Sequence, residues 1–173
     1  MKKNLLINTL QKNDLAAENV MKNFKNNIEN LQIINTDEAN INGCMGCTSC
    51  WLKTPGICSI NDDFNDIFND FVNADSIILL AEGNIGFISS KLKNIIDRLL
   101  PLAIPYTKVS KGTVRHITRY NKRWNIALVY KGNSDKEFLN DWMDRFTSNL
   151  DSNSLGVYTI DESEKVLKKI NSI

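Results

Sequence analysis

Short apolar runs alternate along this chain with longer segments in which apolar residues recur every three or four positions. The runs are typical of buried strands, and the wider spacing is typical of helices with one apolar face. On this basis, strands are predicted at residues 5–7, 31–35, 75–81, 126–130 and 155–160. The third run is unbroken, which suits a strand that other elements cover on both faces.

Helices are predicted between these strands. Asn13 or Asp14 can cap the first helix, which extends to about residue 27. Asn61 or Asp62 can cap the second, whose apolar side chains repeat at helical spacing. Three more helices are predicted to begin near residues 89, 135 and 163.

This order of elements predicts an α/β fold. Strands that alternate with helices form a parallel sheet with helices on both faces, because crossover connections are short and right-handed. The length favours a single domain over residues 1–173. Ligands bind such sheets at the carboxyl ends of the strands. Loops are predicted at that edge at residues 9–14, 82–89 and 131–135.

All four cysteines of the chain lie in one short segment, the cysteine loop at residues 43–60. Thiolates are soft metal ligands and good nucleophiles. Because the loop leaves the second strand at the carboxyl edge, we expect it to face a ligand bound there. The spacing of Cys44, Cys47, Cys50 and Cys58 leaves three interpretations open: a 4Fe-4S cluster with one thiolate per iron, free or disulfide-switching thiols, or zinc. Zinc usually takes two separated cysteine pairs and fits this spacing less well.

The composition of the chain argues against two classes of binding partner, nucleic acid and membranes. Lys and Arg number 21 against 20 Asp and Glu, so there is no strong positive charge for nucleic acid or an anionic membrane. No apolar run is long enough to span a bilayer, and the first residues do not form a signal peptide. We therefore expect a cytoplasmic protein that binds neither nucleic acid nor membrane, with thiols that stay reduced.

Three motifs resemble one known family. Residues 43–58, which end in Cys-Trp-Leu-Lys-Thr-Pro-Gly-Ile-Cys and precede Asp62-Asp63, are similar to the cysteine loop of flavodoxin-like NADPH-dependent FMN reductases and iron–sulfur flavoproteins. Residues 86–98 resemble the family's Gly-x-x-Ser-x-x-Leu-Lys-x-x-x-Asp-Arg segment. Residues 116–120 resemble a His-x-x-Arg-Tyr segment of one branch.

The resemblance implies a flavodoxin-like three-layer fold with a five-stranded parallel sheet in the order 2-1-3-4-5. It also implies FMN in the edge loops, NAD(P)H or a ferredoxin-type protein as electron donor, and a homodimer. The cofactor-binding residues it implies are Thr9, Lys12, Asn13, Gly83, Asn84, Ile85, Gly86, Lys131, Gly132, Asn133 and Ser134. In some relatives the cysteines hold a four-iron cluster. The polar, basic segment 108–123 has no clear apolar period and is the expected dimer arm.

The chain departs from the family in its phosphate loop. The family's Gly-Ser-Pro-Arg is replaced here by a segment from Asn8 to Asp14, and Glu82 follows the third strand. Lost donors and added carboxylates predict weak FMN binding. The expected function is therefore an FMN-dependent oxidoreductase. The alternative is a degenerate flavodoxin-like protein that acts as a thiol or metal redox sensor, or as a partner-binding module.

Overall fold

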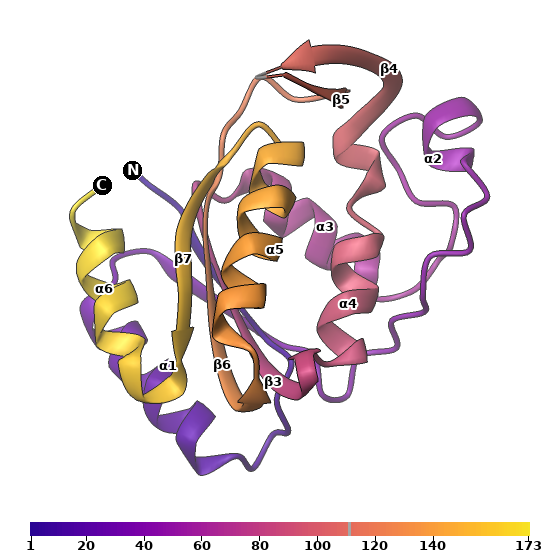
Figure 1. Cartoon of the computed structure of the whole chain (residues 1–173). Helices are drawn as coiled ribbons and strands as arrows, with labels where there is room; N and C mark the ends of the chain where they lie inside the picture. The colour runs from indigo at the N-terminus through magenta and orange to yellow at the C-terminus, as the bar shows by residue number, and fades with distance from the viewer. Residues whose placement is uncertain (111) are drawn as a thin grey trace.

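A computed structural model describes residues 1–110 and 112–173, and its centre is a sheet of five parallel strands (Figure 1). The strands are β1 (Asn4–Asn8), β2 (Leu31–Asn35), β3 (Ser76–Ile88), β6 (Asn125–Ser134) and β7 (Asn153–Thr159). They lie in the order β2-β1-β3-β6-β7. Because β4 and β5 form a separate sheet, this is the predicted order 2-1-3-4-5, and the flavodoxin-like α/β fold is confirmed.

Helices cover both faces of the sheet and make three layers (Figure 1). One face carries α1 (Leu15–Asn27) and α6 (Ser163–Asn171), and the other carries α3 (Phe64–Asn73), α4 (Ser90–Asp97) and α5 (Lys136–Asn149). Successive side chains of a strand point to opposite faces. Accordingly Ile78 packs in the core beneath α1 and α6, whereas Ile77 and Leu79 pack in the core beneath α3, α4 and α5.

The two central strands are longer than the sequence predicts. Residues 82–87 and 131–134 were expected to be loops, but β3 and β6 stay paired there, with Glu82 opposite Lys131 and Gly83 opposite Gly132. Glycine permits this close pairing. A Cβ on Gly132 would lie 2.6 Å from the carbonyl oxygen of Gly83, and the φ angle of Gly132 is +106°, which side chains disfavour.

Segment 108–123 also contains structure that the sequence does not predict. An antiparallel hairpin forms from β4 (Ala103–Ser110) and β5 (Thr113–Thr118), and Lys111 lies outside the described residues. The hairpin projects beyond the end of the sheet where the parallel strands begin (Figure 1). Its strands pair with each other and not with the main sheet, so no buried face imposed an apolar alternation on them.

Helix starts follow the predicted caps in one case and not in another. Asp14 caps α1, as predicted, by accepting hydrogen bonds from the amides of Ala16 and Ala17. The second predicted helix, α3, begins at Phe64 after Asp63, one residue beyond the expected cap. The carboxylate of Asp62 still accepts from the amide of Phe64 at 3.2 Å, and it also binds Arg98.

Among the helices of the described residues, none combines the length and the apolar character that crossing a bilayer requires. The cytoplasmic location stays a prediction.

Candidate functional site

A polar cleft of about 400 Å³ opens at the carboxyl ends of β1, β3 and β6. It lies where the sequence predicts a ligand, at the point where the sheet order reverses between β1 and β3. Its lining comes from the segment after β1, the end of β3, the start of α4 and the end of β6: Thr9, Leu10, Gln11, Asp14, Glu82, Asn84, Ser89, Ser90, Lys91, Lys131 and Gly132. We call this the edge cleft.

Some predicted cofactor residues line the edge cleft and others do not. Thr9, Asn84, Lys131 and Gly132 line it. The remaining predicted residues do not: Lys12, Asn13, Gly83, Ile85, Gly86, Asn133 and Ser134. The extra pairing of β3 with β6 explains part of this difference, because Gly83 is buried there and the Ser134 hydroxyl donates to the carbonyl of Phe87. Whether these residues contact a cofactor stays a prediction.

Sequence reasoning did not predict Ser90 and Lys91 at the ligand, and it included Leu10, Gln11 and Ser89 in the edge loops without naming them as cofactor residues. Ser89 was placed where an edge loop ends and a helix begins, and a serine before a helix at a strand's carboxyl end is itself a signal for an anion or ligand site. Its hydroxyl oxygen is buried and has no hydrogen-bond partner in the described part of the chain, and it does not cap α4. It is therefore free to bond to a ligand.

The lysines that line the edge cleft are paired with carboxylates of the chain. The carboxylate of Asp14 accepts from the amides of Ala16 and Ala17 at 3.0 Å, and from the ammonium of Lys131 at 2.7 Å. The hydrogen bond from Lys131 is the main cause that lowers the pKa of Asp14. This carboxylate stays ionised at neutral pH and covers the start of α1.

Several other donors after β1 are also used. The amide and hydroxyl of Thr9 both donate to the carbonyl of Leu80, and the amide of Lys12 donates to Asp37. The ammonium of Lys12 pairs with Glu38 at 2.8 Å. A phosphate needs several free N–H donors at a helix start. The residues present therefore do not fit the phosphate of FMN, although the rest of the cleft offers room and the free Ser89 hydroxyl to the neutral part of a flavin.

The cysteine loop lies at the opposite end of α4, next to the hairpin, and not beside the edge cleft (Figure 1). Its short helix α2 (Ser49–Leu52) is anchored by the indole of Trp51, which donates to the carbonyl of Leu100 at 3.0 Å and packs on the ring of His116. The expectation that the loop faces a ligand at the carboxyl edge is therefore wrong. Residues 36–48 are long enough to carry the cysteines back along α4.

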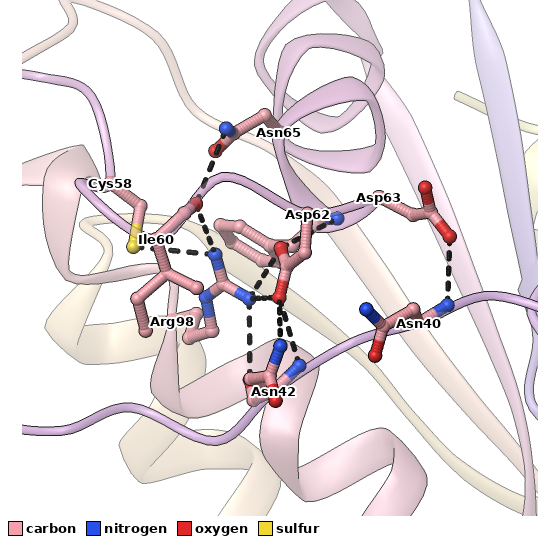
Figure 2. Close-up of polar contacts among 9 residues, drawn as sticks. Asn40, Asn42, Cys58, Ile60, Asp62, Asp63, Asn65 and Arg98 are labelled. Carbon is pink, nitrogen blue, oxygen red and sulfur yellow. Dashed lines mark hydrogen bonds and ion pairs between the residues drawn. The ribbon is translucent and has the colours of Figure 1, made fainter.

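One buried arginine holds the cysteine loop in place (Figure 2). The guanidinium of Arg98, at the end of α4, donates to the carboxylate of Asp62 at 2.6 Å and to the sulfur of Cys58 at 3.3 Å. It also donates to the carbonyls of Asn42 and Ile60 at 3.2 Å. The side chains of Arg98 and Asp62 are fully buried, and the guanidinium lies 4.2 Å from the centre of the Phe64 ring. These bonds tie both ends of the loop to one helix terminus.

The four thiols line one recess together with Arg98, but the recess measures only about 20 Å³. That volume holds about one water molecule, not a cubane of four irons and four sulfides. Within residues 1–110 and 112–173, no group of three or more His, Cys, Asp or Glu side chains is arranged to hold a metal ion. The arrangement therefore does not fit a 4Fe-4S cluster or zinc.

The thiols differ in environment. Cys47 is exposed, and hydrogen bonds from Ser49 and Ser59 lower its pKa to about 7. Cys50 is buried, and this burial raises its pKa, with repulsion from the other three cysteines adding to the effect. The loop thus presents one reactive thiol and shields another.

Comparisons with known proteins agree with this fold. No family model matches the chain. A stretch of 75 residues is 36% identical to an iron–sulfur flavoprotein of Methanocaldococcus jannaschii, and it covers 43% of this chain and 38% of that protein. A second iron–sulfur flavoprotein of the same organism is 25% identical over 105 residues, covering 61% of this chain and 52% of that protein. The matches thus span about half or less of these curated relatives.

Solved structures resemble the whole chain at low identity. RosB with a bound flavin-phosphate intermediate has a TM-score of 0.68 at 10% identity, covering 99% of this chain and 77% of that one. An NAD(P)H:quinone oxidoreductase from Methanothermobacter marburgensis has a TM-score of 0.66 at 8% identity, and the match covers 99% of this chain and 95% of that one. An FMN-dependent NADH-azoreductase from Bacillus anthracis, in complex with FMN, has a TM-score of 0.57 at 17% identity, and the match covers 99% of this chain and 97% of that one. The resemblance to flavodoxin-like reductases in fold, and to iron–sulfur flavoproteins in sequence, is confirmed.

Replacing Asp62 with Asn should destabilise the fold. It removes the charge that compensates a buried guanidinium, and breaking such a pair costs about 3–5 kcal/mol. The exposed pair between Lys93 and Asp97 on α4 is the control, and Asp97→Asn should cost about 0.5 kcal/mol or less. Burial alone would raise the pKa of Asp62, but hydrogen bonds from Arg98 and Asn42 lower it from 3.8 to about 2.

The free energy of unfolding, from urea titration, is the measurement for both variants. Because the pKa of Asp62 is depressed in the folded state, its stabilisation is present above pH 3.8 and is lost as the pH falls through about 2. The difference between Asp62→Asn and the unmodified protein should shrink over that interval. Equal losses for Asp62→Asn and Asp97→Asn at neutral pH would contradict the structure.

Cys47 should be the first thiol to react with iodoacetamide, because the thiolate is the nucleophile and its pKa is about 7. Peptide mapping by mass spectrometry after timed alkylation at neutral pH gives the order, with Cys50 the slowest. In Ser59→Ala the reaction at Cys47 should slow and its pH midpoint should rise. Faster labelling of Cys50 than of Cys47 in the native protein would show that the loop has another conformation.

Proposed function

We propose that the protein is a flavin-dependent oxidoreductase that accepts electrons from NAD(P)H. The observation that carries the proposal is the edge cleft, which crosses the carboxyl ends of three parallel strands of a flavodoxin-like sheet. The sequence relatives, which are iron–sulfur flavoproteins, and the structural neighbours, which include an FMN-dependent azoreductase and an NAD(P)H:quinone oxidoreductase, support the same chemistry. They do not favour the alternative of a degenerate sensor or partner-binding module.

The chain's own residues would bind and orient the flavin. The free hydroxyl of Ser89 and the amide of Asn84 are the polar groups suited to ring carbonyls and nitrogens, and Leu10 offers an apolar contact. When bound, the flavin supplies the hydride and electron chemistry itself. Among the described residues that line the cleft there is no His or Cys, so no thiol or imidazole is assigned a role.

FMN remains the cofactor predicted from the sequence, with affinity weakened at its phosphate. A 4Fe-4S cluster, which the names of the relatives suggest for them, is not used in this proposal, because the thiol recess does not fit one. A ferredoxin-type protein is the alternative electron donor. Iron and sulfide analysis of anaerobically purified protein separates these cases: the protein should contain neither in stoichiometric amount.

Filling the edge cleft should abolish flavin binding. Ser90 is exposed and lines the cleft, so Ser90→Trp would place an indole there without disturbing the core. We expect flavin affinity, followed by flavin fluorescence, to fall at least about tenfold through lost contact and steric exclusion. Ser172→Trp, at the exposed end of α6, is the control and should bind normally.

The same preparations test the activity. Under anaerobic conditions, NADH or NADPH should bleach the visible absorbance of flavin bound to the unmodified protein and to Ser172→Trp, but not that of flavin added to Ser90→Trp. If the unmodified protein bound no flavin of any kind, the proposed function would be wrong and the sensor alternative would take its place.

We also propose a homodimer formed through the hairpin. Val109 and Val114 face each other across β4 and β5 and are 77% and 70% exposed, and Tyr106, on the same strand as Val109, is 71% exposed. Sedimentation equilibrium should give twice the chain mass, and the double variant Val109→Lys, Val114→Lys should be monomeric. Leu15→Lys, at the equally exposed start of α1, should leave the mass unchanged. A monomer at micromolar concentration in the unmodified protein would rule out this interface.

A further inference from the structure

The start of α1 already holds an anion that belongs to the chain. One oxygen of Asp14 accepts from two consecutive amides of the first helical turn, and the other binds the ammonium of Lys131. A bound phosphate would take the same combination of helix-start amides and a nearby cation. The carboxylate therefore stands where a ligand phosphate would lie and uses the donors that a phosphate would need.

The charges around Asp14 disfavour a second anion. Each of the three lysines at this edge has a carboxylate partner: Lys131 pairs with Asp14, Lys12 with Glu38 and Lys91 with Asp37. Glu82 adds a further exposed carboxylate to the lining. A phosphate monoester carries a charge of about −1.5 to −2 at neutral pH, so it would meet these carboxylates while these three lysines are already paired.

The same carboxylates suit a neutral hydroxyl chain. An ionised carboxylate is an acceptor with several lone-pair sites, and a hydroxyl is a donor. The terminal hydroxyls of a flavin without phosphate can donate to Asp14 or Glu82, whereas phosphate oxygens cannot. The free Ser89 hydroxyl, at the other side of the cleft, remains available for the ring system.

We propose that Asp14 substitutes for a ligand phosphate, so that the edge cleft selects riboflavin, the flavin without phosphate, over FMN. The proposal rests on the proposed flavin function and adds its cofactor specificity. Asp14 is the specificity-determining residue, and Glu82 acts in the same direction. Lys131 holds the Asp14 carboxylate at the helix start and is not a phosphate ligand while that pair exists.

The test is a pair of fluorescence titrations with riboflavin and FMN. The unmodified protein should bind riboflavin at least about tenfold more tightly than FMN, the effect expected from one lost charge-assisted interaction. Asp14→Asn keeps an oxygen acceptor for the helix amides, since Asn is as good a cap as Asp, but it removes the charge and releases Lys131. The ratio of riboflavin to FMN affinity should then shift about 10- to 100-fold toward FMN.

Asp135→Asn is the matched control. Asp135 caps α5 by accepting from the amide of Phe138, but it does not line the edge cleft, so this variant should leave the ratio unchanged. Glu82→Gln is the second test variant, since Glu82 is exposed and caps no helix. It should shift the ratio of riboflavin to FMN affinity toward FMN by a smaller factor. If Asp14→Asn does not fold, this variant tests whether carboxylates at the edge cleft disfavour FMN.

Each outcome separates the two proposals. FMN bound as tightly as riboflavin by the unmodified protein would overturn the specificity inference and leave the flavin function standing. A preference for riboflavin that neither Asp14→Asn nor Glu82→Gln reduces would remove Asp14 from its assigned role. If neither flavin binds the unmodified protein or any variant, both the inference and the proposed function are wrong.

Discussion

The pairing of β3 on both of its edges is the constraint from which the rest of the structure follows. β3 bonds to β1 on one side and to β6 on the other, and its first residues, from Ser76 to Ala81, are buried. A strand whose two edges and two faces are all covered needs a helical layer on each face. Its continuation alongside β6, as far as Gly86, closes two expected loops and sets the floor of the edge cleft.

The helix that follows β3 separates two chemically different regions. α4 begins at the edge cleft and ends at Asp97, just before Arg98, and its eight residues rise about 12 Å. The cleft at its start is polar and open, whereas the recess at its end is small and holds the thiols around a buried guanidinium. The cysteines and the cleft share no lining residue. The two regions therefore need not serve one reaction.

The edge cleft differs from a usual phosphate site in how its anion is supplied. The amides of Ala16 and Ala17 are not left for a ligand, because Asp14 lies within the same chain at the first position before the helix. A carboxylate of the same chain loses no translational or rotational entropy when it binds these amides, and it is present in every molecule. It therefore outcompetes a phosphate from solution for the same donors. The same residue that stabilises α1 thus shapes what the cleft can bind.

The sequence by itself determined the layered fold with parallel strands and the edge at which a cleft forms, whereas the order of the five strands was implied by the family resemblance. Those features depend on local apolar patterns, on the Asp14 cap and on the handedness of short connections, all of which are readable along the chain. A long, strongly apolar run such as the one in β3 predicts a buried strand, whichever strands and helices pack against it.

Only the tertiary structure decided the features that depend on residues far apart. Asp62 binds Arg98, which lies 36 positions away in the sequence, and Lys131 binds Asp14, which lies 117 positions away. No local sequence pattern predicts either pair. The hairpin carries no alternating apolar face, and the long segment before Cys44 allowed the cysteine loop to lie at either end of α4. Long-range charge pairing and loop placement are set by how whole elements pack, because a short stretch of chain contains only one side of each contact.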